Sequence, residues 1–249
     1  MKAWLYGFFM AWGMFLSIPC PAKLWDESAR RHMLACLPLV GAVAGGLWAL
    51  EAWLLALTGC PMPIRAVLIA FFPWLLTGAI HVDGFMDVSD AILSRRDLET
   101  RRRILKDPHC GSFAVISIVL LSAAVFALCM TKEISGLALV SLGLIPVSTR
   151  ACAAIAVSVM RPMSTSQYSS MGEGKRFGML ILPILLLAAA CAVPAALCGC
   201  RGLAPLASAA VYWLAALYGF KQLDGMNGDI SGYALTLGEA AGLAVLVLI

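Results

Sequence analysis

The chain has 249 residues, of which 61% are hydrophobic and only 13% are charged. A soluble domain usually has about 25% charged residues, so this chain lacks the charge to cover a large water-facing surface. Its formal net charge of +4 is small and dispersed, which argues against nucleic acid as a partner. Several apolar runs approach the roughly 20 residues of a membrane-spanning helix, and no alternating segments of a β-barrel are visible. The composition predicts an all-α, polytopic integral membrane protein with a single domain over residues 1–249.

Apolar segments and polar loops alternate along the chain. We interpret residues 3–19 as an uncleaved membrane or interfacial helix in preference to a signal peptide. Further spans are predicted at 34–58, 64–80, 112–130, 134–158, 178–199, 203–219 and 233–249. The longer polar loops lie at 22–33, 81–111, 160–177 and 220–232. These segments indicate about six or seven transmembrane helices.

The order of spans and loops predicts a side of the membrane for each loop. If each clear span crosses once, the four longer loops lie together on one side. They hold thirteen Lys and Arg residues, whereas the other side holds Arg65, Lys132 and Arg201, plus Lys2 if the first segment also crosses. Because cytoplasmic loops are enriched in Lys and Arg, we predict that all four longer loops are cytoplasmic.

Nine cysteines raise the possibility of a metal or disulfide framework. Most of them lie in or at the ends of apolar runs. Their closest pair is Cys198-Gly-Cys200, which lacks the Cys-x-x-Cys spacing of zinc sites. We therefore interpret them as small apolar packing residues.

The sequence HVDGFMDVSD at residues 81–90 holds the clearest chemical signal. Asp83, Asp87 and Asp90 follow an i, i+4, i+7 spacing, which places three carboxylates on one face of a helix. Carboxylates next to an apolar span are costly unless solvent or a cation compensates them. Carboxylate oxygens suit hard cations, above all Mg²⁺ bound together with substrate phosphates. We predict that these three residues bind a metal and that Gly84 lets a ligand approach the backbone.

Two charged residues inside apolar runs are further candidates. Arg150 lies deep in a predicted span, where an arginine needs a partner such as Asp83, Asp87, Asp229 or a bound phosphate. Glu239 lies about two helical turns into the last span. It is either an acid that faces the same cavity or a structural partner of Arg150.

Residues from other loops are expected on the same side of the membrane. Gly228 and Asp229 lie in a Gly/Asp-rich turn, a weak signal alone because both are ordinary turn residues. His81 has two possible interpretations: it supports the metal site, or it is simply a histidine at the membrane interface. The basic run at 95–106 is interpreted mainly as a topology signal, with one or two arginines that clamp phosphate as the alternative.

The motif at 81–90 resembles the H-x-D-G-x-x-D-x-x-D signature of the cobalamin synthase family, the adenosylcobinamide-GDP ribazoletransferases. Other segments are similar to that family in the same order: residues 15–19 (FLSIP), 37–41 (LPLVG), Lys106-Asp107 before 111–113 (GSF), Arg150, and Gly228-Asp229 with Glu239. The chain departs from the pattern at 91–93 (AIL) in place of glycines, at Ala114 in place of glycine and at Asn227 in place of threonine. Residues 169–174 (SSMGEG) match a family loop only loosely.

This resemblance implies a late step of vitamin B12 biosynthesis. The adenosylcobinamide-phosphate group would pass from adenosylcobinamide-GDP to α-ribazole or its 5′-phosphate, giving adenosylcobalamin or its phosphate and GMP, with Mg²⁺ as cofactor. The implied catalytic residues are Asp83, Asp87, Asp229 and Arg150. The implied residues for binding the cofactor and substrate are His81, Gly84, Asp107 and Gly228. The implied location is the lipid bilayer of the cell (inner) membrane, as a monomer or a homo-oligomer.

Two other functions are weighed against this one. A CDP-alcohol phosphotransferase also places Asp-Gly and further aspartates at a helix end, but its signature has Ala-Arg where this chain has Asp87-Val88. A transporter with an acidic relay would place its acids nearer the bilayer midplane, often within inverted repeats, and no convincing repeat is visible.

Overall fold

The computed structural model describes residues 2–163 and 176–249. Among them are six helices long and apolar enough to span a membrane. These are α3 (Leu37–Leu57), α7 (Ser112–Thr131), α8 (Ala138–Val159), α9 (Arg176–Leu197), α10 (Ala204–Leu223) and α11 (Gly228–Leu248). A bent pair, α4 (Met62–Leu76) and α5 (Ile80–Leu93), makes a seventh if it counts as one span. The predicted all-α polytopic architecture is confirmed.

Shorter elements surround these helices. They are α1 (Lys2–Phe15), α2 (Arg30–Ala35), α6 (Leu98–Ile104) and the 3-10 turns η1 (Glu27–Ala29) and η2 (Gly199–Leu203). At 1.5 Å per residue the 14 residues of α1 rise only about 21 Å. This is less than the roughly 30 Å of a hydrocarbon core, so α1 is too short to cross. It packs instead along α2 and α3.

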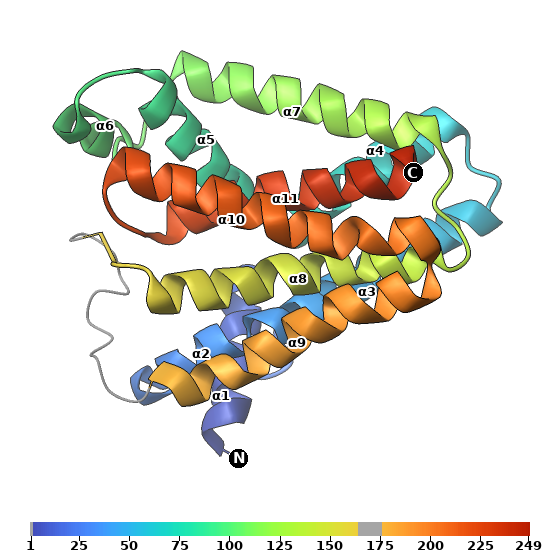
Figure 1. The fold of residues 1–249 in the computed structure, drawn as a ribbon, viewed down its shortest axis with the longest axis horizontal. Helices are drawn as coiled ribbons and strands as arrows, with labels where there is room; N and C mark the ends of the chain where they lie inside the picture. The colour runs from blue at the N-terminus through green and yellow to red at the C-terminus, as the bar shows by residue number, and fades with distance from the viewer. Residues whose placement is uncertain (1, 164–175) are drawn as a thin grey trace.

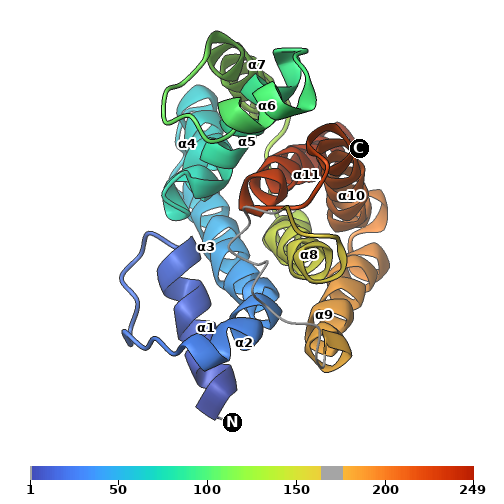
Figure 2. The ribbon, with the colours of Figure 1, turned by 90° about the vertical axis from the view of Figure 1, so that its left-hand side faces the viewer.

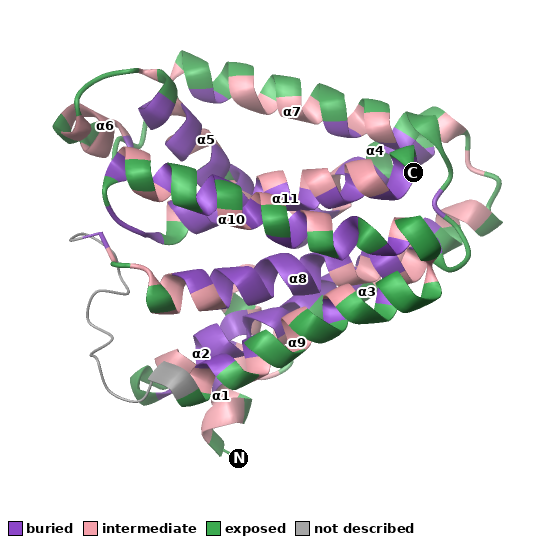
Figure 3. Cartoon of the chain, in the orientation of Figure 1, coloured by how far each residue is buried: buried purple, intermediate pink, exposed green. Residues whose placement is uncertain are grey.

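Helix α8 occupies the middle of the bundle, with α3, α9, α10 and α11 around it (Figure 2). Helices α8 and α11 are buried over most of their surface, whereas α7 and α9 are largely exposed (Figure 3). Small residues bring α3 against α8, because a Cβ on Gly41 would lie 2.5 Å from the carbonyl oxygen of Pro146. This close contact fixes the helix that holds Arg150.

The predicted span at 64–80 is wrong at its end. Helix α4 stops at Leu76, and the chain turns by 90° before α5 begins. Gly78 and Ala79 both have left-handed backbone conformations, with φ of 59° and 60°, which no helix continues. The Ala79 carbonyl then accepts the Asp83 N–H at 2.9 Å and starts the new helix. The acidic motif is therefore a separate helix that leaves the line of α4.

The predicted polar loop at 220–232 is also much shorter than expected. Helix α10 continues to Leu223, and Asp224 ends it in a left-handed conformation with φ of 52°. Helix α11 begins at Gly228, since the side chain of Asn227 caps it by accepting the Ile230 N–H at 2.9 Å. Asp229 consequently lies in the first turn of a helix and not in a flexible loop.

The polar connections gather at one end of the bundle. Figure 1 shows α2, α6 and the α10–α11 turn at its left end, and the α3–α4, α7–α8 and α9–α10 connections at its right end. The right end is tied by an ion pair of 2.7 Å between Arg65 and Glu133. This arrangement agrees with the parity argument for the described part of the four loops. The segment 169–174 lies outside the described residues.

Candidate active site

The acidic helix α5 crosses the start of α11 at very close range. A Cβ on Gly84 would lie 2.8 Å from the carbonyl oxygen of Asp229, and one on Gly232 would lie 3.1 Å from the carbonyl oxygen of His81. The rings of Phe85 and Tyr233 stack beside the crossing, 5.7 Å apart and nearly parallel. Glycine at position 84 is therefore needed to bring the two backbones together. We refer to this contact as the α5–α11 crossing.

Three predicted acids meet at the α5–α11 crossing. Asp83 and Asp87 come from α5, one residue before and three residues after Gly84, and Asp229 comes from the first turn of α11. The carboxylate of Asp87 is repelled by the like charges of Asp83, Asp229 and Asp90. Asn227 donates from its amide to Oδ2 of Asp229 at 2.6 Å and so fixes that carboxylate. The structure thus brings together acids that are about 140 residues apart in the sequence.

Asp90 lies one turn further along α5 and faces the start of α7. Its Oδ1 accepts the Ala114 N–H at 3.4 Å. A side chain at Gly111 would overlap its carboxylate. An acid placed at a helix N-terminus satisfies free backbone N–H groups and the helix dipole. Asp90 therefore anchors α7 beside the crossing, and its role as a metal ligand stays a prediction.

Asp107 is not brought to the α5–α11 crossing by any contact of the described residues. Its Oδ1 accepts the His109 N–H at 3.0 Å and lies 2.7 Å from Nδ1 of the same histidine. These hydrogen bonds, the backbone one first, hold the pKa of the exposed Asp107 carboxyl below its usual value. Its predicted part in binding is untested by this geometry.

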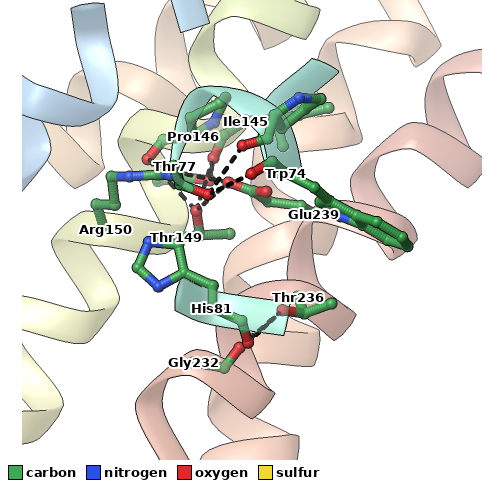
Figure 4. A network of polar contacts seen from close by, with 12 residues as sticks. Trp74, Thr77, His81, Ile145, Pro146, Thr149, Arg150, Gly232, Thr236 and Glu239 are labelled. Atoms are coloured by element: carbon green, nitrogen blue, oxygen red, sulfur yellow. Dashed lines mark hydrogen bonds and ion pairs between the residues drawn. The ribbon is translucent and has the colours of Figure 1, made fainter. Parts of the chain in front are cut away.

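Arg150 and Glu239 form a buried ion pair between α8 and α11 (Figure 4). Nη1 of Arg150 lies 2.6 Å from Oε1 of Glu239, and the two side chains are only 2% and 8% exposed. Thr149 adds a hydroxyl 3.5 Å from the same oxygen. Of the two interpretations of Glu239, the structure selects the partner of Arg150.

His81 lies next to this ion pair at the start of α5 (Figure 4). Its ring stacks on Phe15 of α1, with centroids 6.0 Å apart. Its carbonyl oxygen accepts the Thr236 hydroxyl at 3.1 Å, which ties α5 to α11. Its buried Nε2 has no hydrogen-bond partner among the described residues. His81 thus faces the bundle interior and not the acid face of α5.

A cluster of contacts around Asp224 was not expected from the sequence. Arg102 of α6 pairs with Asp224 at 3.1 Å, and Arg161 pairs with its other carboxylate oxygen. Both arginines also donate to the Asp224 carbonyl oxygen. We call these three residues the Asp224 clamp. The Asp224 clamp fixes the turn that precedes Asp229. Its three residues are far apart in the sequence, so no local spacing could predict their contacts.

Asn227 is the other functional residue that sequence reasoning missed. It was noted only as a departure from the family pattern. An asparagine directly before a helix is a typical N-cap, so that signal was present in the sequence. Its contact with Asp229 required the structure.

Comparisons with known proteins show to which family the chain is similar. The family model for cobalamin-5-phosphate synthase, CobS, matches residues 7–247. A curated protein of Clostridium perfringens strain 13, named adenosylcobinamide-GDP ribazoletransferase, is 37% identical over the whole of both chains. A protein of the same name from Clostridium botulinum strain Alaska E43 is 34% identical over 98% of this chain and 97% of its own.

A third protein with that name, from Geobacillus kaustophilus, is 32% identical over 96% of this chain and 93% of its own. No solved structure matches the chain. The match of the family model covers nearly every residue, including both helices of the α5–α11 crossing. The chain belongs to the cobalamin-5-phosphate synthase (CobS) family.

Proposed function

We propose that this chain is an adenosylcobinamide-GDP ribazoletransferase, which catalyses a late step of cobalamin biosynthesis. The proposed active site rests on one observation, the α5–α11 crossing. There Asp83, Asp87 and Asp229 meet without a basic partner among the described residues. The name of the activity comes from the family and from relatives that match over their full length. The substrates are adenosylcobinamide-GDP and α-ribazole or its 5′-phosphate.

The reaction is a displacement at phosphorus. A hydroxyl oxygen of the ribazole attacks the phosphorus that carries the cobinamide, and a new P–O bond forms. The bond between that phosphorus and the bridging oxygen of the pyrophosphate breaks, and GMP leaves with the electron pair. We assign the hydroxyl proton to Oδ1 of Asp229, because the Asn227 amide holds Oδ2. Such catalysis depends mainly on positioning and electrostatic stabilisation.

The acids at the crossing fit a magnesium ion by the chemistry of their donors. Four carboxylates, those of Asp83, Asp87, Asp90 and Asp229, offer hard oxygen ligands and repel one another. No three His, Cys, Asp or Glu side chains of the described residues converge closely enough to hold a metal alone. Mg²⁺ is usually bound by one or two carboxylates together with substrate phosphates, so the pyrophosphate would complete the ligand set.

We assign Asp83 and Asp87 as the first metal ligands and Asp90 as the third predicted one. When bound, Mg²⁺ neutralises charge on the pyrophosphate and on the leaving GMP. The contact of Asp90 with the start of α7 would then couple the position of that helix to the site. Gly228, at the start of α11, leaves the backbone open to the substrate. The predicted ligand approach at Gly84 is wrong, because the backbone of Asp229 covers that position and the glycine serves the close packing of the two helices.

The acid end of the bundle is assigned to the cytoplasmic side of the cell (inner) membrane. The support is the excess of Lys and Arg in the loops at this end. On this side the water-soluble nucleotide product can leave directly. The chain is embedded in the lipid bilayer, and it works as a monomer or a homo-oligomer.

The test is product formation by the purified protein in lipid nanodiscs. With Mg²⁺, adenosylcobinamide-GDP and a ribazole acceptor, we expect equal amounts of GMP and of a cobalamin product. Turnover of a CDP-alcohol with no release of GMP would favour a CDP-alcohol phosphotransferase. Substrate flux into vesicles without any product would favour a transporter.

A further inference from the structure

A groove lies between α1 and the segment that follows it, residues 16–25. One wall is a face of α1 that presents Phe9, Gly13 and Met14, and the other wall is the following segment up to Trp25. The volume of the groove is about 590 Å³, within the roughly 300–1,000 Å³ of small-molecule sites. None of its described lining residues belongs to α5 or α11, so the groove is separate from the α5–α11 crossing.

The groove is built into the fold on both sides. The indole of Trp12 donates to the Ile18 carbonyl at 3.3 Å, and the segment therefore folds back along α1. The thiol of Cys20 adds a contact of 3.6 Å to the Phe9 carbonyl oxygen. On its other face α1 is held against α2, because a Cβ on Gly7 would lie 2.6 Å from the α2 backbone. Both walls are thus held in place by packing and hydrogen bonds of the protein itself.

Lys23 is the single charged side chain among the described residues that line the groove. It is exposed and forms no ion pair with a described residue. The acids that follow it are engaged elsewhere. Glu27 pairs with Arg30 at 2.6 Å and accepts the Trp25 indole N–H at 2.8 Å, and the side chain of Asp26 caps η1. The groove therefore combines apolar walls with one uncompensated cation, which favours an apolar ligand with an anionic end.

Helix α1 has the orientation of a helix at a membrane surface. It lies across the long helices in both views (Figure 1 and Figure 2), as does a helix in the plane of an interface. Trp25 is 54% exposed, and tryptophan is enriched at the level of the lipid headgroups. Lys23 belongs to the loop at 22–33, on the side assigned to the cytoplasm, where anionic lipids give the leaflet a negative surface potential. The surroundings of the groove thus contain ligands that match the charge of Lys23.

We propose that this groove binds one anionic phospholipid of the cytoplasmic leaflet. The phosphate lies beside Lys23, and one acyl chain follows the wall that contains Met10 and Met14, whose flexible side chains adapt to the shape of the chain. The volume suits a single acyl chain. Adenosylcobinamide-GDP and α-ribazole match these walls poorly, because both carry many hydrogen-bonding groups and the walls are mostly apolar.

The bound lipid reaches the active site through the segment that forms the second wall. The Ser17 N–H and hydroxyl both donate to the Leu76 carbonyl, at 2.8 and 3.0 Å, where α4 ends. The ring of Phe15, two residues earlier, stacks on His81 at the start of α5. A lipid that orders residues 16–25 therefore also steadies the bend from which the acidic helix departs. Anionic lipid should consequently raise turnover, a part of the inference that rests on the proposed function.

The test of binding uses phosphatidylglycerol with a diazirine on one acyl chain, photo-cross-linked to the full chain in detergent. The cross-linked peptide should lie within residues 9–25. Unlabelled phosphatidylglycerol should compete at least about fivefold better than phosphatidylcholine with the same acyl chains, the effect of about one lysine near an anionic headgroup. Cross-links that avoid residues 9–25, or equal competition by the two lipids, would overturn the site. Displacement by adenosylcobinamide-GDP but not by phosphatidylglycerol would overturn it in favour of a substrate groove.

Two variants separate the headgroup from the acyl chain, each with a matched control. K23Q should bring the competition ratio of the two lipids near one, whereas K132Q, at an exposed lysine of the opposite end, should keep it. A Cβ on Gly13 would meet nothing within 4 Å, so G13F places a ring in the groove without a clash. It should lower cross-linking within residues 9–25 by about tenfold, while G46F, on the open side of α3, should leave it unchanged. Wild-type behaviour of both K23Q and G13F would contradict the proposal.

GMP release in nanodiscs tests the coupling to the active site. It should be about fivefold faster with phosphatidylglycerol than with phosphatidylcholine, and K23Q should abolish the difference. Equal rates of the wild type in the two lipids would overturn the coupling. Absence of GMP in every lipid would refute the proposed transferase, while the cross-linking result would still decide whether the groove binds lipid.

Discussion

Glu239 of α11 holds Arg150 of α8 at 2.6 Å in the interior of the bundle. The pair joins α8 and α11, the two most buried of the long helices. It does not include the acids of the α5–α11 crossing. Each charge is tolerable in this apolar setting only because of the other. The pair therefore stabilises the fold, and the buried Nε of Arg150 has no hydrogen-bond partner among the described residues.

The ion pair should show strong coupling in a double-mutant cycle. E239Q leaves the Arg150 charge buried without a counter-ion, and R150M does the same to Glu239, so each should cost about 3–5 kcal/mol of stability. The double variant R150M/E239Q removes both charges and should lose less than the sum by about 2 kcal/mol or more. Thermal unfolding in detergent measures all four proteins. Additive losses would show that the pair contributes no coupling.

G84A should separate the two helices of the α5–α11 crossing. The new methyl group would lie 2.8 Å from the Asp229 carbonyl oxygen, and overpacking of this kind typically costs about 1–3 kcal/mol. We expect at least about a tenfold loss of kcat, because small displacements of catalytic groups are costly. G46A, on the open side of α3, is the matched control and should keep wild-type turnover. Equal activity of G84A and the wild type would refute the crossing as the site.

Asn227 has two separable functions. N227S keeps an N-cap acceptor for α11 but loses the amide that holds Oδ2 of Asp229. N227A loses both and should unfold more easily by about 1 kcal/mol. We expect both variants to lose turnover to a similar extent, while only N227A loses stability. Full activity of N227S would show that the amide does not position Asp229.

Helix number and the acidic face followed from hydropathy and from an i, i+4, i+7 spacing, both of which are local properties. The break after α4 did not, because Gly78 and Ala79 adopt left-handed conformations inside an otherwise apolar run. The early start of α11 was missed because glycines and an aspartate were interpreted as a loop, although Asn227 is a good cap. The pairing of Arg150 with Glu239 and the Asp224 clamp join distant segments. The sequence could offer such contacts only as alternatives.

Two native cysteines test the orientation of the bundle. Cys110 is exposed at the acid end and Cys200 is exposed at the opposite end. In chains that keep only one of the two, a membrane-impermeant maleimide added to intact cells should label Cys200 and spare Cys110. Permeabilised cells should show labelling of both. External labelling of Cys110 alone would reverse the assignment of the acid end to the cytoplasm.

The metal assignment predicts different effects for the acids on α5 and for an acid on the neighbouring helix α6. D83A or D87A should abolish turnover while the protein stays in the membrane, since each removes a predicted ligand. E99A, which removes an exposed acid of α6, is the matched control and should retain turnover. Wild-type rates in D83A or D87A would contradict the assignment.

The most direct measurement is the dependence of GMP release on Mg²⁺ concentration for the wild type, D87N and D229N. These two substitutions lie on the different helices that meet at the crossing. If both helices contribute to one metal-dependent site, EDTA should stop the wild-type reaction. Both variants should then require about tenfold more Mg²⁺ or lose turnover altogether. Full wild-type turnover in EDTA, or an unchanged Mg²⁺ dependence in both variants, would contradict the account.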